Sequence, residues 1–274
     1  MTPQQLAALP RPLAFVLPGG GALGSYQVGV LKALTEAGVQ PDLLVGVSAG
    51  SVNAAMLAWN PGPDGVARLE HMWRSIRRRD LMRLQVGRFA MAIAGRHPSF
   101  VDNLHGKRFL TRQFGGRRLE LAPQRVALVA TDLSTGEAVA ITEGETVRAV
   151  LASSAFPGVF PPVEIDGRVF VDGGVVADVP LDLTLQLGAA SALVLSVPWL
   201  AAGTVPKHAL DILFRASSLG VEAHGRTMLR RPPAGLTVVE IPAPTTEVTT
   251  FDVDRSVSVL DQGHACAREW LSRD

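Results

Sequence analysis

The chain has 274 residues, with 26 Lys and Arg against 25 Asp and Glu, and hydrophobic residues make up 47% of it. This hydrophobic share excludes a disordered chain, and the net charge of +1 gives no overall argument for nucleic acid binding. A chain of this length can enclose one large core, so we expect one domain. The single cysteine, Cys266, excludes an intrachain disulfide and a cysteine-based zinc cluster.

The first residues lack the basic region, continuous apolar stretch and cleavage site of a signal peptide, so we expect none. Three uncharged stretches, residues 12–31, 43–63 and 183–206, are long enough to span a membrane. Each is interrupted by Gly, Pro, Ser or Asn, which favours buried strands joined to closely packed helices. We therefore expect no transmembrane helix, and a cytoplasmic protein that is either free or peripheral to the membrane.

Two strand–turn–helix units open the chain. The first is a strand at residues 13–17 and a helix at 24–37, and the second is a strand at 43–47 and a helix at 51–59. Such repeated units predict a mostly parallel sheet crossed by helices. Further patterns predict these elements: strands at 125–131 and 192–197, a hairpin over 164–171 turning at Asp166-Gly167, and helices at 210–229 and 255–271.

Residues 68–118 form a basic segment, with 13 Lys and Arg against three acidic residues and a net charge of +10. Three arginines occupy positions 77–79, and Trp73, Met82 and Phe89 are among the apolar residues between the charges. One interpretation is a solvated helical cap that packs on the core. The other is a surface that meets anionic lipid head groups while apolar side chains enter the interface. The segment has no nucleic-acid motif, so we expect no nucleic acid partner.

The first chemical motif is a G-x-S-x-G sequence, residues 46–50, between the second strand and its helix. Small residues at Gly46 and Gly50 permit a strained turn that exposes the hydroxyl of Ser48. The helix begins directly afterwards, so its positive N-terminal dipole faces an intermediate that carries negative charge. The motif predicts a serine nucleophile, although a glycine-rich turn with an incidental serine has the same sequence.

The second motif is the glycine turn, residues 19–24, between the first strand and its helix. Converging backbone amides there can bind an anion. A dinucleotide site would need an acidic residue at the end of the next strand, and that strand ends at Ser48 instead. The other interpretation is an oxyanion hole beside Ser48, because parallel strands bring both turns to one edge of the sheet.

The third motif is Asp172-Gly173-Gly174 at the end of an apolar strand. Two glycines leave the aspartate free to approach another loop, although Asp-Gly is also common in ordinary β-turns.

Taken in order, the three motifs resemble those of the patatin-like phospholipase family. The glycine turn, bounded by Gly19 and Gly24, is the first of them along the chain. Three further parts of the chain add to the resemblance: residues 29–34 in the first helix, the sequence ASSAFP at 152–157, and Asp178-Val179-Pro180. The resemblance implies a three-layer α/β/α sandwich around a mostly parallel sheet. It implies a catalytic core over residues 13–188, including the basic segment, with residues 189–274 completing the same domain.

The resemblance also implies a serine lipid acyl hydrolase of the phospholipase A or esterase type, acting on a phospholipid or another lipid ester. It places the nucleophile at Ser48, the base at Asp172, and the oxyanion hole at Gly20, Gly21 and Ala22. No cofactor is required, and no metal-binding pattern is present in the sequence. The family usually has Arg or Lys where this chain has Leu23, which puts turnover rate and substrate choice in doubt more than the reaction class.

Four other interpretations stay open. The order Ser48, Asp172, His264 matches an α/β-hydrolase triad, but only one strand precedes Ser48 and His264 falls within a helical pattern. An acyltransferase would use the same dyad with an alcohol in place of water. A dinucleotide-binding protein would use the glycine turn, and an inactive lipid-binding module would keep the fold alone.

Overall fold

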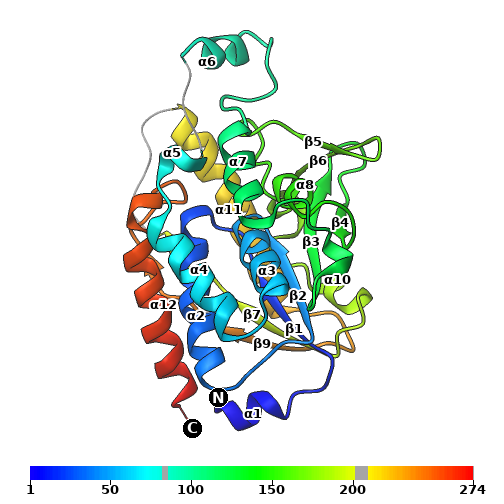
Figure 1. The fold of residues 1–274 in the computed structure, drawn as a ribbon, viewed down its shortest axis with the longest axis vertical. Helices are drawn as coiled ribbons and strands as arrows, with labels where there is room; N and C mark the ends of the chain where they lie inside the picture. Colours follow the sequence, from blue (N-terminus) through cyan, green and yellow to red (C-terminus); the bar gives the residue numbers. More distant parts are fainter. Residues whose placement is uncertain (82–85, 201–208, 274) are drawn as a thin grey trace.

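The computed structural model describes residues 1–81, 86–200 and 209–273. A mixed sheet runs through its centre in the order β5-β6-β3-β2-β1-β7-β9, with β4 paired beside β3 (Figure 1). The strands of this sheet are β1 (Leu13–Leu17), β2 (Leu43–Val47), β3 (Arg125–Asp132), β4 (Ala138–Ile141), β5 (Val163–Ile165), β6 (Arg168–Asp172), β7 (Ser191–Leu195) and β9 (Thr237–Ile241). Two short strands pair apart from it: β8 (Trp199–Leu200) and β10 (Thr245–Thr246).

The α-helices of the described residues are α1 (Pro3–Ala7), α2 (Gly24–Glu36), α3 (Ala49–Trp59), α4 (Pro63–Ser75), α5 (Arg78–Leu81), α6 (Val86–Ile93), α7 (Leu104–Phe114), α8 (Thr146–Ser153), α9 (Gly174–Ala177), α10 (Leu181–Gln186), α11 (Ala209–Arg230) and α12 (Ser256–Leu271). Short 3-10 turns lie at Gly21–Leu23, Leu119–Leu121 and Val253–Arg255.

The central strands β3, β2, β1, β7 and β9 pair in parallel, whereas β4, β6 and β5 pair antiparallel at one edge. The expectation of a mostly parallel sheet is therefore confirmed. Parallel pairing also aligns the ends of β1 and β2, since Leu17 lies opposite Gly46. The glycine turn after β1 and the serine turn after β2 thus leave the same edge of the sheet.

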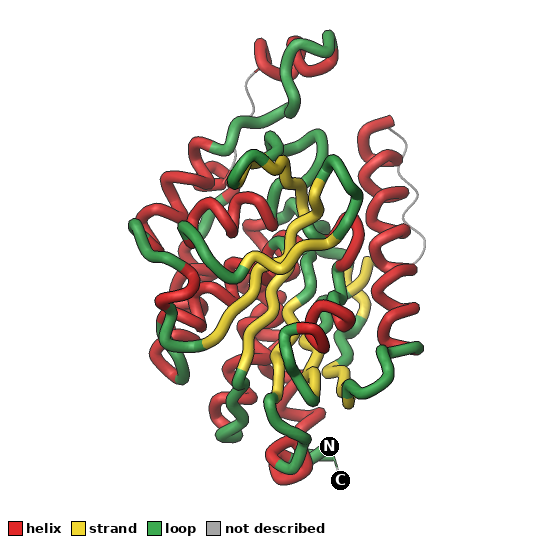
Figure 2. Tube along the Cα trace, turned by 90° about the vertical axis from the view of Figure 1, so that its right-hand side faces the viewer, coloured by secondary structure: helices red, strands yellow, loops and turns green. Residues whose placement is uncertain are grey.

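Both faces of the sheet are covered, which confirms the three-layer sandwich. Phe15 and Leu17 of β1 point into the core shared with α2, α3, α4 and α12, while Ala14 and Val16 point to the core shared with α10 and the end of α11. This alternation is the two-residue period of a strand buried on both sides. Figure 2 shows the sheet between the helices on its left and the long helix α11 on its right.

Most of the predicted elements form where the sequence places them. The hairpin turns at Asp166 and Gly167, both with positive φ, as its short loop requires. Two boundaries differ by two residues and the others by at most one: the predicted helix at 51–59 begins at Ala49, and the strand predicted at 192–197 ends at Leu195. The strand before Ser48 ends at Val47 as predicted, whereas β7 leaves the sheet two residues earlier than predicted.

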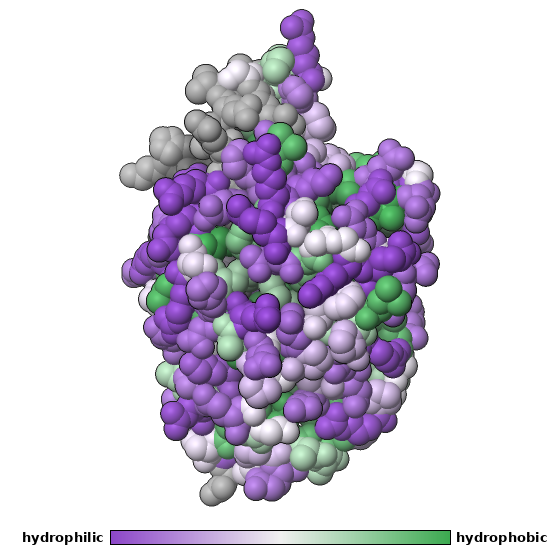
Figure 3. Space-filling view, in the orientation of Figure 1, coloured by the Kyte–Doolittle hydropathy of each residue, from purple (hydrophilic) through white to green (hydrophobic). Residues whose placement is uncertain are grey.

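The basic segment, residues 68–118, includes the end of α4, then α5, α6 and α7. Its residues 82–85, and therefore Met82, lie outside the described part of the chain. Helix α6 projects from the body of the protein, and hydrophilic side chains cover the upper part of the face over α4 and α5 (Figures 1 and 3). Within the described residues, no helix has both the length and the apolar character needed to cross a bilayer.

Several apolar residues of this segment are buried and do not face outward, among them Met72, Trp73 and Ile76. Trp73 is only 4% exposed, and its Nε1–H donates to Asn53 Oδ1 at 2.9 Å. The burial of Trp73 fits the interpretation of a helical cap that packs on the core, because its indole is held there by a buried hydrogen bond. Met91 and Ile93 on α6 are 42% and 65% exposed and are free to make such a contact.

Candidate active site

Ser48 occupies a strained turn between β2 and α3. Its φ is +53°, a conformation that residues other than glycine seldom adopt. The residues on either side explain why the chain tolerates it. A Cβ at Gly50 would collide with the carbonyl of Leu17 on the neighbouring strand, and a Cβ at Gly46 would lie 2.7 Å from Cβ of Ala54. The two glycines of the G-x-S-x-G motif thus allow the ends of β1 and β2 and the start of α3 to pack closely together.

Three other serines hold this turn in place. The Ser48 amide donates to Ser153 Oγ at 3.0 Å, and Ser153 Oγ donates in turn to the carbonyl of Val129. The Ser48 carbonyl accepts from Ser51 Oγ at 2.6 Å and from Ser154 Oγ at 3.1 Å. With both backbone groups of Ser48 occupied, its side chain is the part that remains available for chemistry.

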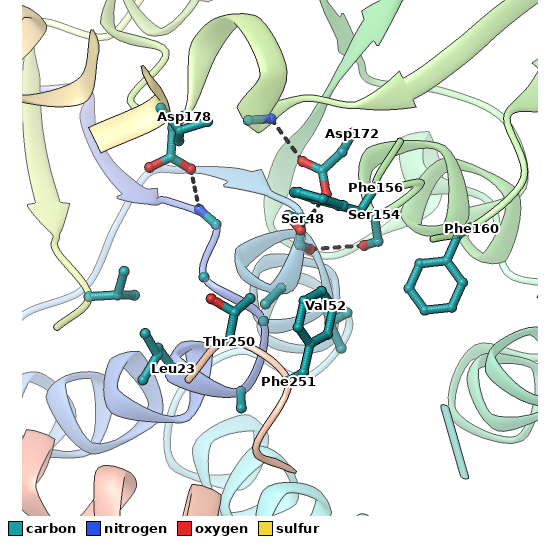
Figure 4. Close-up of a pocket in the computed structure, with 18 of the residues that line it drawn as sticks. Leu23, Ser48, Val52, Ser154, Phe156, Phe160, Asp172, Asp178, Thr250 and Phe251 are labelled. Atoms are coloured by element: carbon teal, nitrogen blue, oxygen red, sulfur yellow. Dashed lines mark hydrogen bonds between the residues drawn. The ribbon is translucent and has the colours of Figure 1, made fainter. Parts of the chain in front are cut away.

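Asp172 meets Ser48 directly. Ser48 Oγ donates to Asp172 Oδ2 at 2.6 Å, and the other carboxyl oxygen accepts from the Gly174 amide at 2.8 Å (Figure 4). Asp172 is 3% exposed. Burial raises the pKa of Asp172 from 3.8 to about 6, although the hydrogen bonds from Ser48 and Gly174 oppose the rise. A carboxylate with a raised pKa is a better acceptor for a serine proton than an ordinary one.

The glycine turn lies beside this pair, with its two outer amides already engaged. The Gly19 amide donates to Asp178 Oδ1 at 2.7 Å, and the Ala22 amide donates to the carbonyl of Thr250 at 2.8 Å. Ala22 therefore cannot donate to an oxyanion in this conformation, contrary to the prediction for that residue. Among the hydrogen bonds of the described residues, none uses the amides of Gly20 or Gly21 as donors.

A cavity of about 790 Å³ opens next to Ser48 and Asp172. Its walls are mainly apolar, and Figure 4 shows Val52, Phe156, Phe160 and Phe251 around Ser48. Leu23 lies there too. In the described part of the chain, the charged residues that line the cavity are all acidic: Asp172, Asp178 and Glu222. Cavities of this size typically bind small organic ligands.

His264 lies away from this site. Its Nε2 is 2.9 Å from Glu36 Oε2, on the surface where α12 packs against α2. The fold therefore does not bring the residues of an α/β-hydrolase triad together. Among the described residues, acidic side chains and no basic ones line the cavity beside the glycine turn, which also disfavours the binding of a pyrophosphate there.

Several residues of the site were not assigned a role from the sequence. Ser153, Ser154 and Asp178 lie within sequence motifs, but their contacts to residues 48 and 19 join distant parts of the chain. Thr250 carries no sequence signal at all, since it contributes a main-chain carbonyl. Glu222 is 7% exposed and is paired with Arg215 at 3.0 Å and Arg226 at 3.2 Å.

Solved structures with some similarity to this chain include two bacterial proteins. The structure of ExoU with SpcU from Pseudomonas aeruginosa gives a TM-score of 0.48 at 17% identity, and covers 96% of this chain and 52% of that one. VipD from Legionella pneumophila gives a TM-score of 0.45 at 12% identity, over 96% of this chain and 67% of that one.

Curated relatives match more closely in sequence. Lysophospholipase nte1 of Aspergillus niger is 31% identical over 179 residues, which are 65% of this chain and 11% of that protein. An uncharacterized NTE family protein of Mycobacterium bovis is 31% identical over 172 residues, 62% of this chain and 44% of the relative. Mouse patatin-like phospholipase domain-containing protein 6 is 29% identical over 187 residues, covering 68% of this chain and 13% of that protein. The chain thus spans less than half the length of these relatives.

The family model described as patatin-like phospholipase matches residues 15–185, which include the glycine turn, Ser48, Asp172 and Asp178. This range covers more than half of the chain, and two of these three relatives carry the family's name or a lysophospholipase name. The chain belongs to the patatin-like phospholipase family.

Proposed function

We propose that this protein is a serine lipid acyl hydrolase in which Ser48 is the nucleophile and Asp172 the general base. The observation that carries the proposal is the 2.6 Å hydrogen bond from Ser48 Oγ to Asp172 Oδ2, at the edge of an apolar cavity. Family membership and the lysophospholipase name of a relative support lipid ester hydrolysis as the reaction.

In the first half of the reaction, Asp172 Oδ2 takes the proton of Ser48 as Oγ attacks the ester carbonyl carbon. The carbonyl oxygen becomes an oxyanion, and the free amides of Gly20 and Gly21 are the proposed donors to it. The bond to the leaving alcohol then breaks, and Asp172 returns the proton to that alcohol. An acyl-serine remains.

In the second half, Asp172 takes a proton from a water molecule, whose oxygen attacks the acyl carbon. The ester bond to Ser48 breaks, Ser48 Oγ regains the proton and the fatty acid leaves. The apolar walls of the cavity suit an acyl chain, because burying its methylene groups is favourable by about 0.8 kcal/mol each. Each half needs Asp172 in its ionised form, so we expect kcat/KM to rise with pH through the pKa of about 6.

The test is hydrolysis of a short-chain p-nitrophenyl ester and of phospholipid and lysophospholipid substrates by three proteins. We expect the wild type to release free fatty acid and the Ser48→Ala variant to lose about 10⁴-fold or more in kcat/KM. Ser258→Ala is the matched control, because it removes an exposed serine hydroxyl on α12, outside the cavity. Full turnover by Ser48→Ala would refute the assignment, and transfer of the acyl group to an added alcohol would identify an acyltransferase instead.

We further propose that the basic segment, residues 68–118, meets anionic membrane lipids. Two observations support it: the arginines at 77–79 are exposed, and projecting α6 exposes Met91 and Ile93. Basic residues at an anionic bilayer each contribute roughly 1 kcal/mol, and exposed apolar side chains add to that by entering the interface.

Co-sedimentation with vesicles tests this contact. We expect tighter binding to anionic than to zwitterionic vesicles, weakened by salt, and weaker binding when residues 77–79 are all changed to Gln. The matched control changes three exposed arginines outside the segment, Arg231, Arg268 and Arg273, to Gln. Equal binding to both vesicle types, or an equal loss in both triple variants, would refute a specific role for the segment.

A further inference from the structure

The three consecutive glycines of the glycine turn raise a physical problem for an oxyanion hole. Glycine has more conformational freedom than any other residue, so a run of three does not hold its amides in one direction by itself. Stabilising an oxyanion requires donors that are fixed before the charge develops. Some contact outside the turn must therefore hold it.

Two such contacts bracket the two free amides. On one side the Gly19 amide is bound to Asp178 Oδ1 at 2.7 Å, and on the other the Ala22 amide is bound to the Thr250 carbonyl at 2.8 Å. Gly20 and Gly21 lie between these anchors, with φ of +148° and +57°. The Thr250 contact uses only main-chain atoms, so Asp178 is the anchor that depends on the identity of a side chain.

The surroundings of Asp178 suit this task. It is 3% exposed, and it caps the end of α9, the short helix that begins just after Asp172. Gly19 is wedged between it and the nucleophile: a Cβ there would lie 2.9 Å from Asp178 Oδ1 and 3.1 Å from Ser48 Cβ. A Cβ at Gly174 would lie 3.2 Å from Asp172 Oδ1 and 3.4 Å from Asp178 Oδ1, so both carboxyl groups flank one glycine.

We propose that Asp178 is a positioning residue for the reaction: its carboxyl group fixes the glycine turn through the Gly19 amide and so aims the Gly20 and Gly21 amides at the carbonyl oxygen attacked by Ser48. The inference rests on the proposed function of Ser48 and extends it to a residue that does not touch the reacting atoms. Figure 4 shows the arrangement, with Asp172 directed at Ser48 and Asp178 directed at the turn.

The charge of Asp178 is consistent with this role. Its pKa is raised to about 7, mainly by burial and also by the negative charges of Asp172 on β6 and Glu222 on α11, against the effect of the Gly19 hydrogen bond. Glu222 is itself paired with Arg215 and Arg226. Below that pH the Asp178 side chain is mostly neutral, so it accepts from Gly19 without adding a full negative charge beside the oxyanion.

Kinetics of two variants separate positioning from charge. Asp178→Ala removes the acceptor, and misplaced donors of this kind cost about 10²-fold, so we expect that loss in kcat with KM little changed. Asp178→Asn keeps an oxygen for Gly19 without a charge, so it should restore most of kcat. Asp182→Asn, an exposed aspartate on α10, is the matched control. A wild-type kcat in Asp178→Ala, or equal losses in Asp178→Ala and Asp178→Asn, would overturn the proposal.

A second measurement begins with the wild type, so it does not rest on the activity of the variants. In an amide NMR titration of the wild type, the Gly19 signal should follow a group with a pKa near 7. In Asp172→Asn the midpoint should move to lower pH, because a like charge is removed, and in Asp178→Asn the titration should vanish. A Gly19 signal that does not titrate, or that still titrates in Asp178→Asn, would overturn the anchor.

Failure of the inference and failure of the proposed function give different results. An active wild type whose Ser48 is essential, together with a fully active Asp178→Ala, would overturn the positioning role alone. A wild type that hydrolyses none of the esters would overturn the proposed function, and the positioning role of Asp178 with it, even if the Gly19 signal titrates.

Discussion

The serine turn and the basic segment differ in how closely their residues are packed. Around Ser48, neighbouring glycines touch the main chain of other elements, the φ is strained, and each backbone group has a defined partner. In the basic segment, the arginines at 77–79 and the tip of α6 are exposed, and a Cβ at Gly87 would meet no atom within 4 Å. The role proposed for the serine turn depends on the exact positions of its atoms, whereas the role proposed for the basic segment depends on which residue types it exposes.

This difference indicates how each region should respond to change. A catalytic turn built from close backbone contacts has almost no tolerance, because main-chain atoms cannot move aside as side chains can. The lipid contact proposed for the basic segment depends on scattered charges, so it should weaken gradually as charges are removed. Substitutions matched between the two regions can therefore test the comparison.

The largest effect should come from the base. Asp172→Asn keeps the shape of the side chain but cannot take the serine proton, so we expect kcat to fall by about 10³-fold or more. His264→Ala is the matched control, because its histidine pairs with Glu36 outside the site. Steady-state hydrolysis of a soluble ester measures both. Loss of activity in a correctly folded His264→Ala would instead support a triad of Ser48, Asp172 and His264.

Next in size is a pair of glycine substitutions. The Cβ in Gly50→Ala would strike the Leu17 carbonyl, so the free energy of unfolding should fall by about 3 kcal/mol or more. Gly87→Ala in α6 adds a Cβ in open space, and alanine favours a helix over glycine by roughly 0.8–1 kcal/mol, so stability should stay equal or rise slightly. Urea denaturation compares them, and similar losses in both would contradict the distinction between the regions.

The sequence predicts local turns of the chain but not the contacts between distant residues. The strand, Ser48 and helix follow one another within a few residues, so periodicity and glycine spacing reveal the turn, just as Asp166-Gly167 reveals the hairpin. The hydrogen bond between Gly19 and Asp178 joins residues 159 apart in the sequence, and the one between Ser48 and Ser153 joins residues 105 apart. Local patterns carry no information on such pairs. The hydrogen bond from Trp73 to Asn53 could not be predicted for the same reason, since Asn53 lies on another helix.

A third prediction concerns stability as a function of pH. Because burial raises the pKa of Asp172 from 3.8 to about 6, the folded state disfavours its charged form. The wild type therefore loses stability as pH rises from about 4 to 6, whereas Asp172→Asn has no such group to ionise. We expect Asp172→Asn to be more stable at pH 8 by roughly 1–3 kcal/mol, with the difference vanishing below pH 4. Chemical denaturation at several pH values tests it, and a difference independent of pH would contradict the buried ionised base.

The smallest effect should come from α6. Changing Met91 and Ile93 to Gln removes two exposed apolar side chains, so binding to anionic vesicles should weaken several-fold, in line with roughly 1 kcal/mol or less for each partly inserted side chain. Hydrolysis of a soluble short-chain ester should not change. Unaltered vesicle binding in this double variant would show that charge alone recruits the protein.

The central claim, that Ser48 is a nucleophile activated by Asp172, is tested most directly by labelling the wild type with a fluorophosphonate probe and mapping the modified peptide. We predict one covalent adduct, on Ser48, absent in Ser48→Ala, strongly slowed in Asp172→Asn and normal in Ser258→Ala. An adduct on another residue, or no adduct in a wild type that hydrolyses esters, would contradict the account.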